Sequence, residues 1–125
     1  MWDKRAKIID VHDGDTVTAV LDQGFGDTKQ IKVRLFGVFA PELSQPGGPE
    51  TRQHLEAMLH AEELTGYTWP VIITTARTPR SDVEVETLGR YVATITGLDQ
   101  TRNINLELAA WITAQGYGGG IGAPA

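Results

Sequence analysis

The segment from Lys32 to Glu42 reads KVRLFGVFAPE, and the rest of the chain is interpreted around it. Its apolar residues alternate with polar ones as far as Leu35, which is the period of a half-buried β-strand. Pro41 has no N–H to donate and therefore ends the ladder. The pattern predicts a cation, Arg34, on the wet face of a strand, and a carboxylate, Glu42, on a stiff turn just beyond it.

This pairing of a guanidinium and a carboxylate suits phosphate chemistry. The planar fork of Arg34 matches the oxygens of a phosphate, and the carboxylate of Glu42 could orient a water molecule. The alternative is an ordinary strand with a surface arginine and a glutamate in a turn. The segment alone does not separate these two interpretations.

Composition places the chain among soluble globular proteins. It has 125 residues, of which 41% are hydrophobic and 22% are charged, enough for one core without covalent staples. We expect one domain over residues 1–117, followed by a flexible Gly-rich tail over residues 118–125. The absence of cysteine excludes a disulfide framework, a thiol nucleophile and a zinc–thiolate site.

The sequence shows no sign of membrane insertion or export. No apolar run approaches the roughly 18 residues that span a bilayer. The first residues lead directly into a strand pattern and lack the apolar core of a signal peptide. We therefore expect a cytoplasmic monomer that does not contact membranes.

The net charge of −5 argues against general binding of nucleic acid. Nonspecific nucleic-acid binders carry a positive excess, because neutralising phosphates supplies most of their affinity. Any such contact by this chain must depend on a local cluster of Arg and Lys or on a bound cation.

Hydrophobic periodicity predicts five strands and two helices in the order β-β-β-α-β-β-α. Asp13-Gly14 is a hairpin signal, because glycine accepts the positive φ of a tight turn, and Pro49 fits the first turn of a helix. We read residues 77–89 as a polar loop. The expected strands are residues 7–11, 16–21, 30–38, 69–75 and 90–96, and the expected helices are residues 50–63 and 103–115.

This order predicts an α+β fold that is mainly β. Five strands with a helix between the third and the fourth are typical of the OB-fold, a Greek-key barrel that often binds oligonucleotides. We expect the first helix to bury a stripe formed by Thr51, Leu55, Met58 and Leu59. The second should bury Ile104, Leu108, Trp111 and Ile112. His54 and His60 show no metal-ligand spacing and are read as solvated helix residues.

Three short pieces, in this order and spacing, resemble the staphylococcal nuclease (thermonuclease-like) family. They are the Asp13-Gly14-Asp15-Thr16 turn, the segment from Arg34 to Glu42, and Leu88-Gly89-Arg90. The resemblance extends from about Lys7 to about Gln115 and includes Asn105 in the last helix. It implies hydrolysis of the 5′ P–O bond in DNA or RNA, leaving 3′-phosphate ends.

The resemblance also implies a role for each matching position. Asp15 would ligate a calcium ion, together with the backbone carbonyl of Ala40. Arg34 and Arg90 would grip the scissile phosphate, and Glu42 would be the general base. Such a set is physically sensible, because two bidentate guanidiniums and a hard cation stabilise a phosphodiester as it gains negative charge.

The sequence departs from the family pattern at the metal and at the base-binding position. Phe39 stands where the family usually has a second metal-ligating aspartate, and Asp13 is a conceivable substitute ligand. Phe39 also shares the parity of Leu35, so it could simply point into the barrel. Glu86-Thr87-Leu88 supplies no aromatic platform for a base, which leaves Tyr91 as a candidate substrate contact.

Two hypotheses follow for the function. The first is a calcium-assisted nuclease that acts on single-stranded or flexible nucleic acid. The second is a related OB-fold module that has lost effective metal binding and holds an oligonucleotide, a nucleotide or a protein partner. Asp15, Arg34, Glu42 and Arg90 together favour the first, whereas Phe39 and the acidic balance favour the second.

Overall fold

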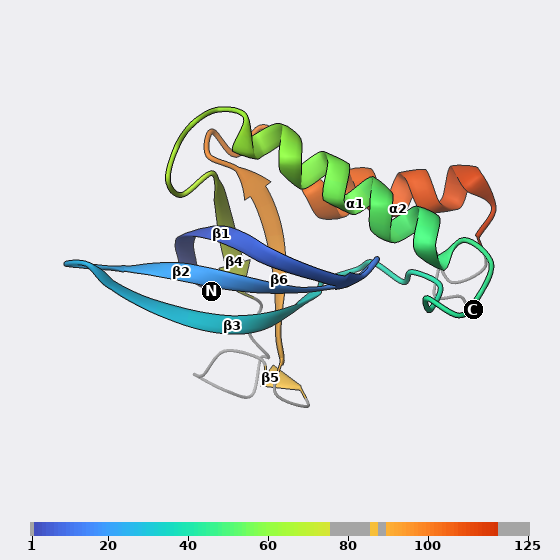
Figure 1. Ribbon diagram of the computed structural model, residues 1–125, viewed down its shortest axis with the longest axis horizontal. Helices are drawn as coiled ribbons and strands as arrows, with labels where there is room; N and C mark the ends of the chain where they lie inside the picture. The colour runs from blue at the N-terminus through green and yellow to red at the C-terminus, as the bar shows by residue number, and fades with distance from the viewer. Residues whose placement is uncertain (1, 76–85, 88–89, 118–125) are drawn as a thin grey trace.

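A closed five-stranded β-barrel with two helices packed beside each other forms the protein, which is mainly β (Figure 1). The computed structural model describes residues 2–75, 86–87 and 90–117. Within them, no helix is long and apolar enough to cross a membrane. The expected tail, residues 118–125, lies outside the described residues, as does most of the expected loop 77–89.

The barrel strands follow each other in the spatial order β3-β2-β1-β4-β6. All neighbours are antiparallel except β3 and β6, whose parallel pairing closes the barrel. A sixth, two-residue strand adds to the outside of β6 within the segment expected to be a loop. The strands are β1 (Trp2–Asp13), β2 (Thr16–Gly24), β3 (Asp27–Leu35), β4 (Val71–Thr75), β5 (Glu86–Thr87) and β6 (Arg90–Gly97).

Several strand boundaries differ from the expected ones for local reasons. β1 begins at Trp2 because residues 2–6 pair with β4, a long-range contact that periodicity does not reveal. β4 begins only after Pro70, which has no N–H for the ladder. β3 ends at Leu35 and not at residue 38, because Gly37 turns the chain with φ +75.

Both helices were predicted to within two residues. Helix α1 (Gly48–Glu63) carries Pro49 in its first turn, and its buried face contains the predicted stripe. Helix α2 (Ile104–Gln115) is capped by the side chain of Asn103, which accepts a hydrogen bond from the N–H of Leu106. Hydrophobic side chains from the strands and both helices form one core, with Leu35, Leu55 and Leu108 fully buried.

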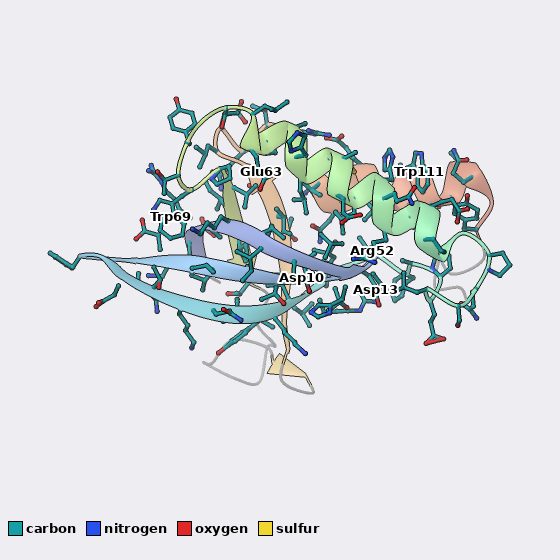
Figure 2. All side chains as sticks on the ribbon, viewed as in Figure 1. Asp10, Asp13, Arg52, Glu63, Trp69 and Trp111 are labelled. Atoms are coloured by element: carbon teal, nitrogen blue, oxygen red, sulfur yellow. The ribbon has the colours of Figure 1, made fainter. Side chains whose placement is uncertain are left out.

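One helix prediction is wrong. His54 is not a solvated residue, because its ring stacks on Trp111 of α2 with centroids 4.1 Å apart and an interplanar angle of 7°. Burial, followed by the positive charge of Arg102, lowers the pKa of His54. This stack joins the two helices on their outer side, where Figure 2 labels Trp111.

Candidate nucleic-acid site at the end of the barrel

The turn between β1 and β2 brings Asp15 to one end of the barrel. The backbone N–H of Asp15 donates to the Asp13 carboxylate at 3.1 Å, and its carbonyl accepts from the N–H of Leu35 at 2.8 Å. Gly14 has no room for a side chain, because a Cβ there would lie 2.6 Å from that of Ala40. The turn is therefore held against both β3 and the segment that follows it (Figure 2 labels Asp13).

Arg34 meets Asp15 at this end. Strands β2 and β3 pair Thr16 with Arg34. Asp15 directly precedes Thr16, and Nη2 of Arg34 lies 3.7 Å from its Oδ2. Nη1 of Arg34 donates to the carbonyl of Leu35 at 2.6 Å. The arginine side chain is 24% exposed, so it is held in place and still reaches solvent.

Asp15 is an unusual carboxylate, with only 17% of its side chain exposed. Burial raises its pKa from 3.8 to about 6, helped by the neighbouring Asp13, while Arg34 opposes the shift. The hydroxyl of Thr16 donates to Oδ1 at 3.2 Å, and the N–H of Ala40 donates to Oδ2 at 3.3 Å. Two close carboxylates in a desolvated turn need a proton or a cation to balance them.

The acidic pair bears on the predicted calcium site. Among the described residues, no group of three or more His, Cys, Asp or Glu side chains is placed to hold a metal ion. Asp13 and Asp15 nevertheless supply the hard carboxylate oxygens that calcium prefers. The contact from Ala40 to Asp15 uses its amide N–H, and not the carbonyl that the resemblance assigns to the metal. A calcium site at these two carboxylates is therefore a proposal and not an observation.

Phe39 does not point into the barrel, so the expectation from its parity is wrong. The residue is 45% exposed, and its ring centroid lies 5.4 Å from the guanidinium carbon of Arg34. The alternation that holds along β3 fails here because the strand has ended and Gly37 has turned the chain. Val38, the residue before Phe39, is fully buried instead.

Glu42 lies on the exposed loop that leads into α1. Its backbone N–H donates to the side-chain oxygen of Gln45 at 3.0 Å, and its carbonyl accepts from the N–H of Gln45 at 2.9 Å. A Cβ on Gly48 would lie 2.0 Å from the Glu42 carbonyl, so this loop packs closely on the start of the helix. The Glu42 carboxylate makes no hydrogen bond or ion pair with any residue that the structure describes.

The remaining predicted residues lie on β6. The backbone of Arg90 pairs with Lys32, two positions from Arg34 on the adjacent strand. Tyr91 is half-buried against the core, and Nζ of Lys29 lies 5.6 Å from its ring centroid. Asp15 therefore contacts both Arg34 and Ala40, the backbone of Arg90 begins the strand that pairs with β3, and Tyr91 is partly covered.

The buried side chain of Asn105 stabilises this end of the barrel. It is 3% exposed, and its amide nitrogen donates to the carbonyls of Phe36 and Ala93 at 2.9 and 3.0 Å. Its side-chain oxygen accepts from the N–H of Ile95 at 2.9 Å. One buried amide thus ties α2 to β6 and to the residue that follows β3. Only its inclusion in the family resemblance singled it out in the sequence.

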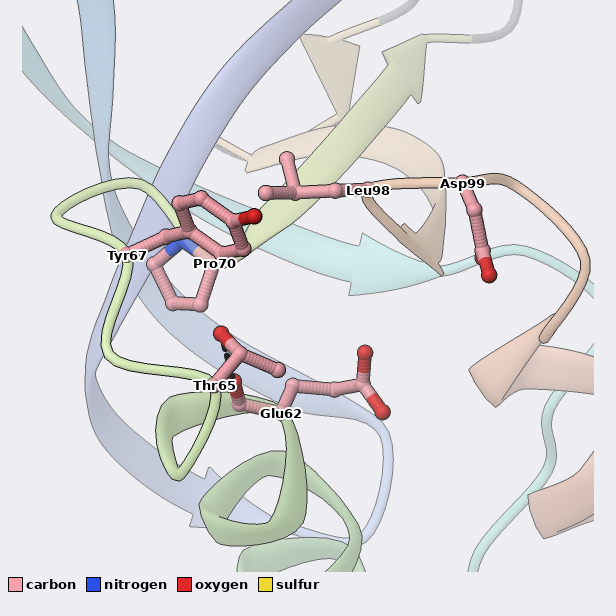
Figure 3. A pocket seen from close by; sticks show the side chains of 6 residues that line it. All are labelled: Glu62, Thr65, Tyr67, Pro70, Leu98 and Asp99. Carbon is pink, nitrogen blue, oxygen red and sulfur yellow. Dashed lines mark hydrogen bonds between the residues drawn. The ribbon is translucent and has the colours of Figure 1, made fainter.

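Two hollows lie elsewhere and are acidic. The first, of about 440 Å³, has an apolar side formed by Tyr67, Pro70 and Leu98 and carboxylates from Glu62 and Asp99 (Figure 3). The second, of about 320 Å³, runs between β1 and α1 and is lined by Asp10, Glu56 and Glu63 among others. Carboxylates repel phosphates, so neither hollow competes with the Arg34 end as a site for nucleic acid.

Sequence reasoning missed two features of this site. It treated Asp13 as a turn former or a substitute ligand, and did not foresee that it raises the pKa of Asp15. It also missed that Phe39 covers Arg34.

No protein-family model matches this chain, and no curated protein matches it in sequence. The chemistry of the site therefore rests on its own residues.

Proposed function

We propose that the protein is a metal-assisted nuclease that hydrolyses phosphodiester bonds in DNA or RNA. The observation that carries the proposal is the meeting of Asp15 and Arg34, 3.7 Å apart, at the end of the barrel where Arg90 begins β6. A core alone gives no reason for a half-buried acid and a solvent-accessible arginine to face each other there. The motif spacing and this convergence together support membership of the thermonuclease-like family and an OB-type barrel.

In this proposal, Arg34 and Arg90 bind the scissile phosphate. Arginine suits this task because its fork donates two parallel hydrogen bonds to two oxygens. One preorganised donor of this kind contributes ~3–4 kcal/mol, or about 10²–10³ in rate. Arg34 is already oriented by Asp15 and by the Leu35 carbonyl, so little reorganisation is needed when the phosphate binds.

Glu42 is the proposed general base. Its exposed carboxylate is unpaired among the residues that the structure describes, so it is available to accept a proton from a water molecule. Its backbone is fixed by Gln45 and by the close approach to Gly48, which limits its movement. Hydrolysis that breaks the 5′ P–O bond would leave a 3′-phosphate.

A hard cation such as Ca²⁺ would be held by Asp15, with Asp13 and the Ala40 carbonyl as further oxygen donors. When bound, it would neutralise phosphate oxygens and lower the pKa of nearby water. Calcium affinity rises with the number of charged ligands, so a site with two carboxylates should bind in the range of about 10⁻⁴–10⁻³ M. Assays therefore need millimolar calcium.

Cleavage of a labelled single-stranded oligonucleotide tests the proposal. The protein is incubated with it in millimolar Ca²⁺, in Mn²⁺ and in EDTA. We expect metal-dependent cleavage that is lost in Glu42→Gln and kept in Glu56→Gln, a matched change on the exposed face of α1. Products should carry 3′-phosphates. Absence of cleavage in every metal would reject the nuclease.

A binding module is the second candidate, favoured by Phe39 beside Arg34 and by the small number of carboxylates. It predicts that single strands bind without being cleaved, and that Arg34→Ala abolishes binding. Retained binding together with no cleavage in any metal would select this candidate over the nuclease.

A further inference from the structure

Two aromatic side chains are exposed in the segment that follows β3, and one of them lies against Arg34. Phe36 is 59% exposed and Phe39 is 45% exposed. Single exposed apolar residues are common on protein surfaces and need no explanation. Phe39 differs because its ring lies against a cationic group, the guanidinium of Arg34.

Phe39 is held outward by the residues on either side of it. Val38 is fully buried in the core, and the N–H of Ala40 is tied to Asp15. Pro41, next along the chain, is also buried. The aromatic ring therefore stands on a short anchored segment, and its exposure is not the result of a loose loop.

The ring of Phe39 is only partly covered. The guanidinium of Arg34 approaches it at 5.4 Å, and nearly half of the side chain remains accessible to solvent. A flat apolar surface beside a phosphate-binding group matches the two parts of a nucleotide, an anionic phosphate and a planar base. Stacking on an aromatic residue is available to every base, because each has a π-face.

We propose that Phe39 stacks on a base of a single-stranded nucleic acid whose phosphate is bound by Arg34. The inference rests on the proposed function in so far as Arg34 binds phosphate. Phe39 then makes the site selective for unpaired strands, because the bases of a duplex already stack on one another and would have to be splayed out. With a net charge of −5, such stacking replaces part of the attraction that a basic surface would give.

Binding measured without cleavage tests the inference. Fluorescence anisotropy in EDTA compares three labelled ligands of equal length: a single-stranded oligothymidylate, an abasic strand with the same phosphates, and a duplex. The wild-type protein should bind the single strand most tightly. Phe39→Ala should weaken that binding by about 5- to 100-fold and leave binding of the abasic strand unchanged.

Three further variants make the result specific. Phe39→Trp should restore base-dependent binding, whereas Phe39→Leu, which is apolar but not aromatic, should not. Phe25→Ala removes a fully exposed phenylalanine at the other end of β3 and should change nothing. Unchanged circular dichroism would show that each variant is folded.

The outcomes distinguish this inference from the proposed nuclease. If the wild type does not prefer the single strand over the abasic strand, or if Phe39→Ala weakens both equally, the stacking role is wrong even when cleavage is observed. If nothing is cleaved but the base preference depends on Phe39, the nuclease proposal fails and the stacking role stands.

Discussion

Among the residues that the structure describes, Arg34 and Arg102 both pair with acids, and they do so in opposite ways. Arg102 is surrounded: its Nε lies 3.1 and 3.0 Å from the two oxygens of Glu107, and its Nη1 lies 2.9 Å from Glu62. Within the described part of the chain, Arg34 contacts the acid Asp15 at 3.7 Å and donates to the carbonyl of its own neighbour, Leu35.

The difference separates a structural arginine from one that is available to a ligand. Arg102 uses its donors to join α1 to the start of α2, and an added phosphate would have to displace two carboxylates. Arg34 is oriented by Asp15 and by the ring of Phe39, and it keeps hydrogen-bond donors for an incoming group. The neighbours of Arg34 therefore orient its guanidinium without using all of its hydrogen-bond donors.

The strongest test of this difference compares the variants Arg34→Lys and Arg102→Lys. Lysine keeps the charge but loses the bidentate fork. We expect Arg34→Lys to lower kcat/KM for single-stranded DNA by about 10²–10³, and Arg102→Lys to change it by less than about threefold. Equal losses in the two variants would show that neither guanidinium has a special relation to the phosphate.

The titration of Asp15 gives the next largest effect. A carboxyl whose pKa is raised by folding stabilises the native state below its ordinary pKa of 3.8, and this stabilisation is lost as pH rises through about 6. Asp15→Asn removes that titration. Urea denaturation in EDTA measures the free energy of unfolding. The difference between the Asp15→Asn variant and the wild type should shift in favour of the variant by on the order of 2–3 kcal/mol from pH 4 to pH 7.

A matched control for this pH effect is Asp27→Asn, which alters an exposed carboxylate at the start of β3. Its pH profile should run parallel to that of the wild type. If the Asp15→Asn profile also ran parallel, burial beside Asp13 would not be unfavourable to the charge, and the balancing cation would lose its physical basis.

Removing Arg102 tests whether this arginine is purely structural. Arg102→Ala leaves Glu62, 16% exposed, without its cation. We expect the protein to lose ~1–2 kcal/mol of stability, since the cluster is partly solvated, and to keep its cleavage rate. Thermal or urea unfolding measures the first and the oligonucleotide assay the second. A stable but inactive variant would reverse the assignment.

The smallest expected effect is on metal affinity. Phe39→Asp adds a carboxylate beside Asp15 and removes the ring from Arg34. Calcium affinity, measured by isothermal titration calorimetry, should rise by about tenfold, as expected for one more charged ligand. Affinity for single strands in EDTA should fall. Unchanged calcium affinity would show that this position is not what limits the metal site.

Much of the fold was accessible from periodicity. Strands such as β2 and helix α1 bury one face each, so their apolar spacing reports their structure directly. The extension of β1 back to Trp2 could not be predicted, because it depends on pairing with β4, which is distant in the sequence. The same is true of β5, which is two residues long and is stabilised by β6.

The candidate site shows where pattern reasoning stops. Asp15 and Arg34, which the motif spacing grouped together, are in contact, because Asp15 lies in the turn directly before β2 and the register of β2 with β3 pairs Thr16 with Arg34. It failed at Phe39, because alternation has no meaning once Gly37 has reversed the chain with φ +75. Electrostatic consequences such as the raised pKa of Asp15 depend on burial in three dimensions and left no trace in the sequence.

The parallel pairing of β3 with β6 makes the proposed phosphate site a product of barrel closure. Arg34 and Arg90 belong to distant parts of the chain, and their strands meet only across this seam, where the backbone of Arg90 pairs with Lys32. The N–H of Phe36 donates to the carbonyl of Ala93 at 2.8 Å there, so its hydrogen exchange reports every opening of the seam. A ligand that bridges both strands would clamp the barrel shut and slow exchange at this amide, before any product is formed.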